Sequence, residues 1–116
     1  MISWLSGTKI FLYQGSVDLR KSYDSLAAIV NHSLGENSLS GSLFLFVNKD
    51  RNRLKILFFD SGGYCLFCKR LETGRFRLPN LAGQIGSKLS VDEVTLSLIL
   101  KGFDPNIQQK LPRYKP

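Results

Sequence analysis

Apolar residues occur first in a short run and then in a stripe of helical spacing. Residues 9–13 (KIFLY) are apolar and rich in strand-forming types, and Gly15 interrupts the run, which predicts a first strand. Beyond Asp18, the apolar residues recur at steps of three and four. They are Leu19, Tyr23, Leu26, Ala27, Val30 and Leu34. This spacing predicts an amphipathic helix that begins near Asp18 and ends at Gly35, a residue type favoured after helix C-termini.

Residues 42–71 alternate between dense apolar runs and short polar stretches. The polar stretches, NKDRN at 48–52 and DSGG at 60–63, have the composition of turns. Because strands joined by such short connections pair antiparallel, the pattern predicts a three-stranded meander. Its predicted strands are 43–47, 53–59 and 64–71, with a shorter edge strand at 75–78 that Pro79 ends.

A second helix is predicted near the C-terminal end. Ser90 and Glu93 have the spacing of a capping box, with Ser90 as N-cap, and Gly102 follows the last apolar residue. The predicted buried face contains Val94, Leu98, Ile99 and Leu100. Together the elements predict an α+β fold, a curved antiparallel sheet of about four to five strands with two helices on one face, in the order β-α-β-β-β-(β)-α.

The length of 116 residues fits one domain and is too short for two independent cores. We expect this domain at residues 1–104 and a basic, proline-containing tail at residues 105–116, which include three of the four prolines and no acidic residue. No apolar run approaches the ~20 residues that span a bilayer, and the first residues lack the pattern of a signal peptide. We therefore expect a cytoplasmic protein with no membrane partner.

The net charge of the chain suggests a polyanionic partner. The chain has 16 Lys and Arg against 9 Asp and Glu, a formal charge of +7 and a pI near 9.7. A small domain with this charge produces a positive field that attracts nucleic acid.

The acidic residues and the one histidine do not have the pattern of a catalytic site. A metal-dependent nuclease needs several converging carboxylates, whereas Asp18 and Asp92 suit helix N-termini and Asp50 and Asp60 fall in predicted turns. His32 is predicted near the end of the first helix, with no catalytic partner nearby in sequence. We therefore expect no enzyme activity, no cofactor and no metal site.

The two cysteines, Cys65 and Cys68, have the spacing of a Cys-x-x-Cys motif but fall in a predicted strand. Residues three apart in a strand point to opposite faces, so they cannot chelate one ion or form a relaxed disulfide. A structural role in a reducing compartment is the favoured interpretation.

Basic residues gather around the meander and before the first helix. Arg53 and Lys55 share a face of their strand, as Arg75 and Arg77 would, and Lys49 lies in the turn nearby. The DNA-binding candidates are Arg20, Lys21, Arg51, Arg53, Lys55, Lys69, Arg70, Arg75 and Arg77. If they converge, they form a stripe that can follow a phosphate backbone. The alternative is a solvated polar face of a one-sided sheet.

The predicted strands are rich in aromatic residues and apolar on both faces. Such a sheet can stack on unpaired bases, as RNA-recognition domains do, or be covered by helices on one face and by a partner on the other. A homo-oligomer is therefore a second possibility, beside DNA as partner.

Several blocks of this sequence together resemble one known family. The blocks are VDLRKSYDSLA at 17–27, GSLFLFVN at 41–48, KILFFD at 55–60 and GYCLFCKRLETGRF at 63–76. They resemble the insertion-sequence accessory protein TnpB of the IS-sixty-six type, over about residues 9–104. Ser22 and the pair Phe58 and Phe59 depart from the family pattern, where glycine and tryptophan are common. The signature positions outside the basic set are Asp18, Asp24, Asp60, Glu72, Gly74 and Phe76.

The resemblance implies a non-catalytic protein that assists transposition beside a separate, element-encoded transposase. It implies DNA or the transposition complex as partner, and it carries over no catalytic residue. Two mechanisms stay open: DNA binding through basic residues of the sheet, and a protein adaptor that docks on the transposase or on itself.

Overall fold

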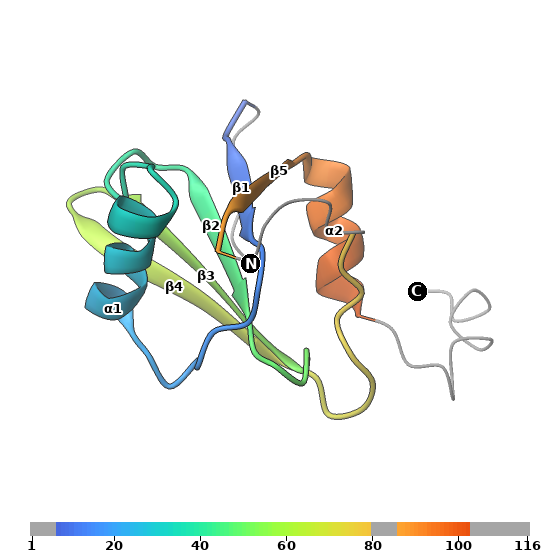
Figure 1. Ribbon diagram of the computed structural model, residues 1–116. Helices are drawn as coiled ribbons and strands as arrows, with labels where there is room; N and C mark the ends of the chain where they lie inside the picture. Colours follow the sequence, from blue (N-terminus) through green and yellow to red (C-terminus); the bar gives the residue numbers. More distant parts are fainter. Residues whose placement is uncertain (1–6, 80–85, 103–116) are drawn as a thin grey trace.

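The computed structural model describes residues 7–79 and 86–102, which form a five-stranded sheet between two helices. The strand order is β4-β3-β2-β1-β5 (Figure 1). The strands are β1 (Ile10–Tyr13), β2 (Leu43–Val47), β3 (Arg53–Asp60), β4 (Gly63–Arg70) and β5 (Lys88–Val91). The helices are α1 (Tyr23–Ala28), which continues into the π-helical turn η1 (Ile29–Ser33), and α2 (Glu93–Lys101). The α+β class and the element order predicted from the sequence are confirmed.

The predicted meander is present with nearly the predicted boundaries. β2 pairs antiparallel with β3, and β3 pairs antiparallel with β4 along its whole length, from Arg53 opposite Arg70 to Asp60 opposite Gly63. Ser61 and Gly62 form the turn between β3 and β4, and both have positive φ angles, of 47° and 84°. A two-residue turn of this kind matches the twist of an antiparallel hairpin.

The sheet is mixed, which corrects the expectation of an antiparallel sheet. β1 and β2 run parallel, with Ile10 opposite Leu43 and Leu12 opposite Leu45, because α1 lies in the connection between them. β5 pairs antiparallel with the other side of β1. Ser90 lies in β5, so the predicted capping box is wrong. The N-cap of α2 is Asp92, whose carboxylate accepts from the backbone N–H of Thr95 at 2.8 Å.

The predicted edge strand at 75–78 is also wrong. Only Arg75 makes a bridge in this segment, whose course is irregular from Arg77 to Pro79. The fifth strand is β5 instead. The predicted C-terminal tail at 105–116 lies outside the described residues.

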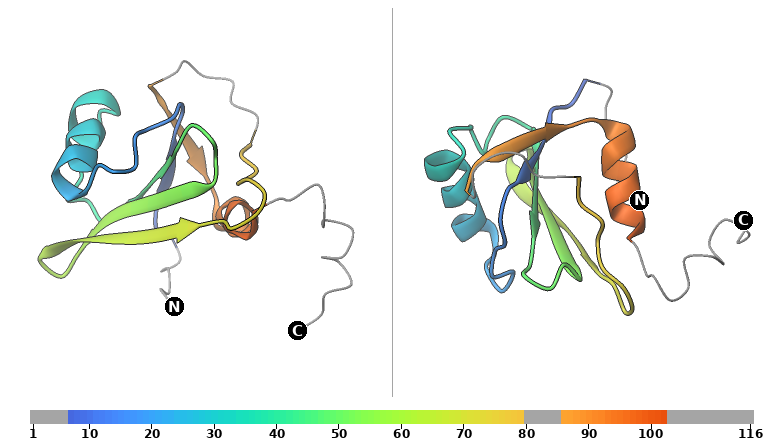
Figure 2. Two further views of the ribbon diagram at one scale, coloured as in Figure 1. Left: turned by 90° about the horizontal axis from the view of Figure 1, so that it is seen from below. Right: turned by 45° about the vertical axis from the view of Figure 1, so that its right-hand side comes forward.

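The two helices cover opposite faces of the sheet, not one face as expected (Figures 1 and 2). On one face Leu26 and Val30 pack with Phe44 and Phe46 of β2. On the other face Leu96 and Ile99 pack with Leu43 and Leu45. Alternate side chains of β2 thus enter two cores, which explains why this strand is buried at every position.

The helices differ from the predicted ones in where α1 begins and in which residues of α2 are buried. α1 begins at Tyr23, so Leu19 packs from the loop before it, although Gly35, with a φ of 64°, follows the helix as predicted. In α2 the buried face contains Leu96 and Ile99, whereas Val94 and Leu98 are exposed. The start at Glu93 sets this phase, because it places residues 96 and 99 on the sheet side.

Candidate nucleic-acid interface

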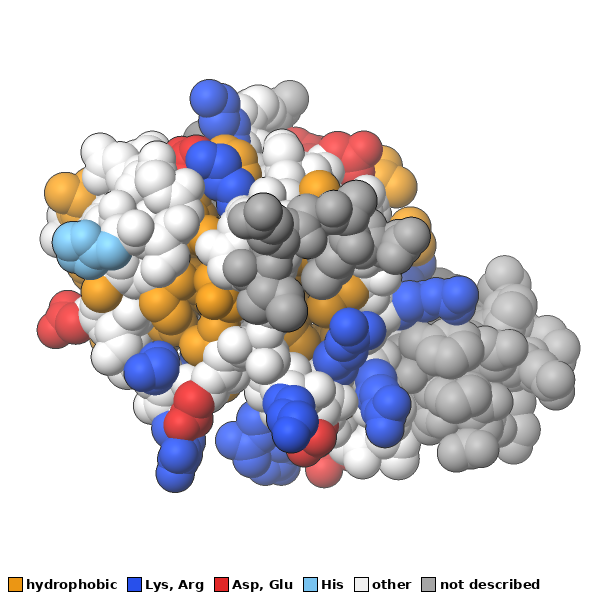
Figure 3. All heavy atoms as spheres, in the orientation of Figure 1, with side chains coloured by type: hydrophobic (Ala, Val, Ile, Leu, Met, Phe, Trp, Pro, Cys, Tyr) orange, Lys and Arg blue, Asp and Glu red, His pale blue; other side chains and the backbone are white. Residues whose placement is uncertain are grey.

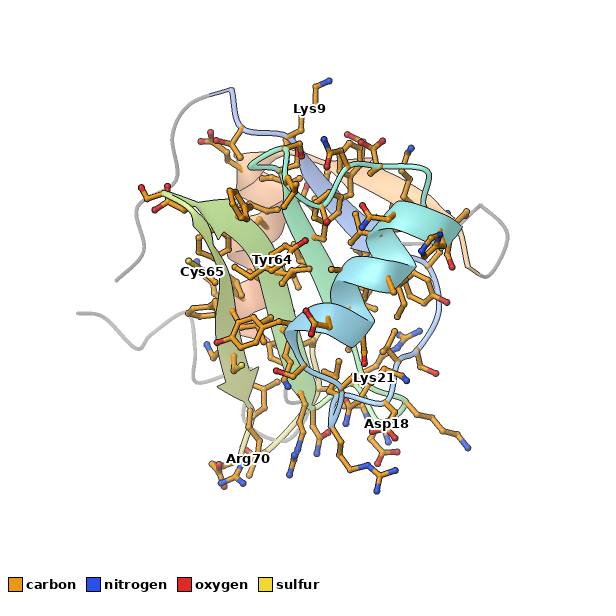
Figure 4. The ribbon with its side chains drawn as sticks, turned by 90° about the vertical axis from the view of Figure 1, so that its left-hand side faces the viewer. Lys9, Asp18, Lys21, Tyr64, Cys65 and Arg70 are labelled. Carbon is orange, nitrogen blue, oxygen red and sulfur yellow. The ribbon has the colours of Figure 1, made fainter. Side chains whose placement is uncertain are left out.

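Most of the basic side chains gather at one end of the sheet. Ten of the sixteen Lys and Arg residues belong to the loop before α1, the β2–β3 turn, the adjoining ends of β3 and β4, and the segment after β4. We call this surface the basic end. Its residues are Arg20, Lys21, Lys49, Arg51, Arg53, Lys55, Lys69, Arg70, Arg75 and Arg77. Figure 3 shows Lys and Arg side chains along this border, and in Figure 4 Lys21 and Arg70 lie at the end opposite Lys9.

Three shallow hollows join these side chains into one surface. A hollow of about 380 Å³ lies between Arg20, Lys49 and Arg53. A second, of about 280 Å³, is lined by Arg53, Lys55 and Arg70, and a third, of about 570 Å³, by Lys49, Arg51, Arg75 and Arg77. Because Arg53 lines two hollows and Lys49 lines two, the basic surface is continuous.

The loop before α1 is held down by buried apolar residues and a backbone hydrogen bond. Val17 and Leu19 are buried in the core beneath α1, and the Val17 N–H donates to the Val47 carbonyl at 3.0 Å. Lys55 donates from Nζ to the Lys21 carbonyl at 2.9 Å, which ties β3 to this loop. Arg20 and Lys21 therefore have a fixed backbone, while their side chains are exposed.

Asp18 belongs to this loop, not to the helix N-terminus predicted for it. Its carboxylate accepts from the Arg20 guanidinium, with 2.7 Å between Asp18 Oδ2 and Arg20 Nη2, and from the Arg20 backbone N–H at 3.0 Å. These bonds lower the pKa of Asp18 well below its ordinary range and raise the pKa of Arg20. The pair is exposed, so it fixes the local geometry more than it stabilises the fold.

Asn48 organises the β2–β3 turn. Its Oδ1 accepts from the backbone N–H groups of Asn52 and Arg53, both at 3.0 Å, and its Nδ2 donates to Asn52 Oδ1 at 2.7 Å. Arg51 ends the turn, because its N–H donates to the Asn48 carbonyl at 3.0 Å, and it has a left-handed φ of 58°. The side-chain hydrogen bonds of Asn48 thus support the backbone from which Lys49, Arg51 and Arg53 project.

Two arginines face each other across the ends of β3 and β4. Arg53 is directly opposite Arg70, a cross-strand arrangement in which like charges repel. Glu72 offsets part of this repulsion, because its Oε2 lies 3.0 Å from Arg70 Nε. Both members of that ion pair are well exposed, so their attraction is weak.

The segment after β4 is anchored by Phe76. Its ring is 1% exposed in the core on the α2 side, and its backbone N–H donates to the Arg51 carbonyl at 2.6 Å. Leu71 adds a bond from its N–H to the Asn52 carbonyl at 2.8 Å. Gly74 has a φ of 82°, a conformation that favours glycine. With Phe76 buried, its neighbours Arg75 and Arg77 are exposed on either side of it.

Some predicted residues do not join this surface, or join it only in part. Lys69 donates from Nζ to the Leu100 carbonyl at 2.7 Å, so its charge lies at the C-terminal end of α2. Asp24 is exposed in the first turn of α1, and Asp60 lies at the far end of β3. The signature positions therefore serve more than one region. Asp18, Glu72, Gly74 and Phe76 support the basic end, whereas Asp24 and Asp60 lie apart from it.

Neither Asn48 nor Lys49 is among the candidates that charge and family signature predict. Lys49 lies in the predicted turn beside Arg51 and Arg53, but nothing in the local sequence indicates that it lines two hollows. For Asn48, the signal is an asparagine at the start of a polar turn, where its short amide can bond to backbone groups a few residues on.

Cys65 and Cys68 are free thiols on opposite faces of β4, as the strand alternation predicted. His32 is exposed at the end of η1. Within residues 7–79 and 86–102, no group of three His, Cys, Asp or Glu side chains could hold a metal ion. No helix in that part of the chain is both long enough and apolar enough to cross a membrane.

Comparisons with known proteins identify relatives for nearly the whole chain. The family model described as "IS66 Orf2 like protein" matches residues 8–110. The protein y4hO of Sinorhizobium fredii, named only as uncharacterized, is 35% identical over 96 residues, which cover 83% of this chain and 81% of the relative. The uncharacterized protein y4jC of the same organism is 28% identical over 116 residues, covering 100% of this chain and 97% of the relative. No solved structure matches. The chain therefore belongs to the IS66 Orf2-like family, whose members are accessory proteins of insertion sequences.

Proposed function

We propose that this protein assists transposition by binding duplex DNA through the basic end. The observation that carries the proposal is the continuity of the basic surface, which combines side chains from four separate segments of the chain. Only Asp18, Asp50 and Glu72 introduce negative charge there. A surface of this kind can follow a phosphate backbone and release the counterions that surround it.

Repulsion within the surface supports the same proposal. The Arg53 and Arg70 pair brings like charges together in a protein that could have used a neutral residue at either position. Such repulsion is relieved when phosphate groups approach. A solvated polar face, the alternative considered from the sequence, does not require charges of one sign to converge.

The adaptor function has lost the observation that favoured it. It rested on strands that are apolar on both faces, and the structure covers both faces with helices. The aromatic side chains of β2 are buried and those of β3 and β4 are only partly exposed, which leaves little aromatic surface on which unpaired bases can stack. DNA binding by the basic end is therefore favoured over a protein adaptor and over single-strand recognition.

The decisive experiment measures binding of the purified protein to labelled duplex DNA from the element's ends and to unrelated duplex, at two salt concentrations. The variant Arg53→Glu/Arg75→Glu is compared with Lys9→Glu/Lys101→Glu, which changes the net charge equally at exposed residues that line none of the three hollows. We expect the first variant to bind at least about tenfold more weakly, with a salt dependence reduced by about two phosphate contacts.

If both double variants bound DNA equally well, the basic end would not be the DNA-binding surface. If the wild-type protein showed no salt-sensitive binding to duplex DNA, the proposed DNA-binding function would be wrong. In that case a pull-down with the element's transposase tests the adaptor function. A preference for the element's ends over unrelated duplex would identify a site-specific factor.

A further inference from the structure

The β2–β3 turn, residues 48–52, stands between two of the three hollows of the basic end. The first hollow includes Leu19, which belongs to the core under α1, and the other includes Phe76, which belongs to the core under α2. Lys49 and Asp50 line both hollows. In Figures 1 and 2 the turn likewise lies between the loop before α1 and the segment after β4. The turn is therefore a ridge with a basic hollow on each side.

Backbone hydrogen bonds hold this ridge and its two flanks together. On one flank the Val17 N–H donates to the Val47 carbonyl at 3.0 Å, and on the other the Phe76 N–H donates to the Arg51 carbonyl at 2.6 Å. The Arg51 N–H closes the turn itself by donating to the Asn48 carbonyl at 3.0 Å. Because backbone bonds join all three segments, little conformational freedom is lost when this surface meets a rigid partner.

A ridge between two basic hollows has the shape and charge that fit a groove of duplex DNA. Each groove has a phosphate strand along either side and base edges on its floor. The major groove, ~12 Å wide, admits a two-stranded β-ribbon, whereas the minor groove is only ~6 Å wide. With the turn in the major groove, Arg20 and Arg53 of the first hollow would meet one strand. Arg75 and Arg77 of the other hollow would meet the second strand.

The basic end has three carboxylates, and two of them are paired with arginines. Asp18 Oδ2 lies 2.7 Å from Arg20 Nη2, and Glu72 Oε2 lies 3.0 Å from Arg70 Nε. The carboxylate of Asp50 forms no ion pair or hydrogen bond within the part of the chain that the structure describes. It is therefore available to accept a hydrogen bond from a ligand.

The structure of the turn does not explain Asp50. Short polar side chains often stabilise turns by bonding to the backbone, and here Asn48 does so, by accepting from the N–H groups of Asn52 and Arg53. Asp50 is exposed and is one of the two central residues of the turn. In the major groove, this position faces the base edges and lies away from both phosphate strands. A carboxylate there can accept from the N4 amino group of cytosine.

We propose that the β2–β3 turn enters the major groove of duplex DNA and that Asp50 accepts a hydrogen bond from the N4 amino group of a cytosine. The arginines of the two hollows contact phosphates of opposite strands, which fixes the orientation of the protein but carries no sequence information. The inference rests on the proposed function and deepens it, because it names the groove and the base that the basic end recognises.

The first test compares Asp50→Ala with Asp60→Ala, which removes an equal charge at the exposed end of β3, beside the other turn. Each full-length protein selects duplexes from a random-sequence pool, and its affinities for a selected and an unrelated duplex are measured. We expect the wild-type protein and Asp60→Ala to prefer cytosine at one position by at least about fivefold. Asp50→Ala should lose this preference but bind unrelated duplex at least as tightly as the wild-type protein, because a negative charge is removed.

These two effects of Asp50→Ala separate base recognition from a structural role. Loss of affinity for both duplexes would assign Asp50 a structural role and contradict the proposal, as would an unchanged preference for cytosine. Salt-sensitive binding by the wild-type protein with no base preference would overturn this inference and leave the proposed function standing. Absence of duplex binding would overturn both.

A second test identifies the groove without altering the protein. It uses a duplex in which every cytosine carries a glucosylated hydroxymethyl group, which fills the major groove and leaves the phosphates unchanged. The wild-type protein should bind this duplex at least about tenfold more weakly than the unmodified one. A drug that occupies the minor groove should not compete. Equal binding to the two duplexes, or competition by the drug, would show that the turn does not enter the major groove.

Discussion

The two ends of the sheet carry different charges and are built in different ways. The basic end combines four segments from distant parts of the sequence, held by hydrogen bonds to the backbone such as those of Asn48 and Lys55. The other end contains the two-residue turn at Ser61 and Gly62 and the loop around Ser38, which we call the turn end. There the Ser38 hydroxyl lies 2.7 Å from the Tyr64 hydroxyl, and the Asn37 side chain accepts from the nearby Leu39 N–H.

The two regions also differ in how well their positive charges are paired with negative ones. Where Lys88 reaches the loop after η1, its ammonium meets Glu36 and the Leu34 carbonyl, so this positive charge is compensated. At the basic end cations outnumber carboxylates, and Arg53 is placed opposite Arg70. Folding gains nothing from that placement. The proposed binding of a negatively charged ligand would relieve this repulsion.

The largest loss of stability is expected from truncating Phe76, the core residue beneath the basic end. Phe76→Ala should lower the free energy of unfolding by about 3–5 kcal/mol, because it leaves a cavity among buried side chains. Phe44→Ala, on the face under α1, should cost a similar amount. DNA affinity, measured where both variants are folded, should fall only for Phe76→Ala. Equal affinity in the two variants would contradict the role of Phe76 in positioning Arg75 and Arg77.

The next effect concerns the turn that presents Lys49 and Arg53. Asn48→Ala removes three hydrogen bonds and should lower the free energy of unfolding by about 1–3 kcal/mol, since it leaves the part-buried Asn52 N–H and the Arg53 N–H without these partners. It should also weaken DNA binding. Asn37→Ala at the turn end removes a single exposed bond to the Leu39 N–H and should do neither to the same extent. Chemical denaturation and duplex binding of both variants make the comparison.

The sequence predicted the local elements well, because they depend on local signals. The alternation of apolar runs with NKDRN and DSGG gave the meander of β2, β3 and β4 within a residue or two at each boundary. The helical stripe and Gly35 also gave the first helix and its end, although this helix begins at Tyr23 and not near Asp18. Such patterns are properties of neighbouring residues, so they can be read without knowing the rest of the fold.

The sequence-based prediction was wrong where a strand forms by pairing with a segment far away in the chain. β5 was missed because Ser90 and Glu93 imitate a capping box, while the pairing of Lys88 to Val91 with β1 is a contact over more than seventy residues. The same strand carries α2 to the opposite face from α1. Strands apolar on both faces therefore suggest helices on one face and a partner on the other, whereas a helix covers each face.

The sequence predicted which residues belong to the candidate site but not how they are arranged in space. Positive charge near the meander pointed to Arg51, Arg53 and Lys55, but the convergence of the loop before α1 with the segment after β4 depends on tertiary bonds. Lys69 shows that nearness in the sequence does not predict which surface a side chain joins. It is next to Arg70 in the sequence, yet its ammonium serves α2 because adjacent strand residues point to opposite faces.

A smaller effect should follow from neutralising one of the facing arginines. Arg53→Gln relieves repulsion with Arg70 and should raise the free energy of unfolding by a few tenths of a kcal/mol, since exposed charge pairs contribute little. The same change should weaken duplex binding severalfold. Lys9→Gln, remote from the basic end, should alter neither property. Loss of stability in Arg53→Gln would show that the arginine is retained for folding and not for a ligand.

The smallest expected effect is the pH dependence of the Asp18 and Arg20 pair. The Arg20 hydrogen bonds hold the pKa of Asp18 below its value in the unfolded chain, about 3.9. The pair therefore stabilises the folded state above that pH, and its contribution is lost as the pH falls through the pKa of the folded state. Asp18→Asn should melt slightly below the wild-type protein at pH 7, and the two melting temperatures should converge under strong acid. The difference at pH 7 should also shrink in concentrated salt, because the pair is exposed. A gap that persisted in acid would assign the effect of Asp18 to its bond with the Arg20 N–H, which an asparagine holds less strongly, and not to its charge.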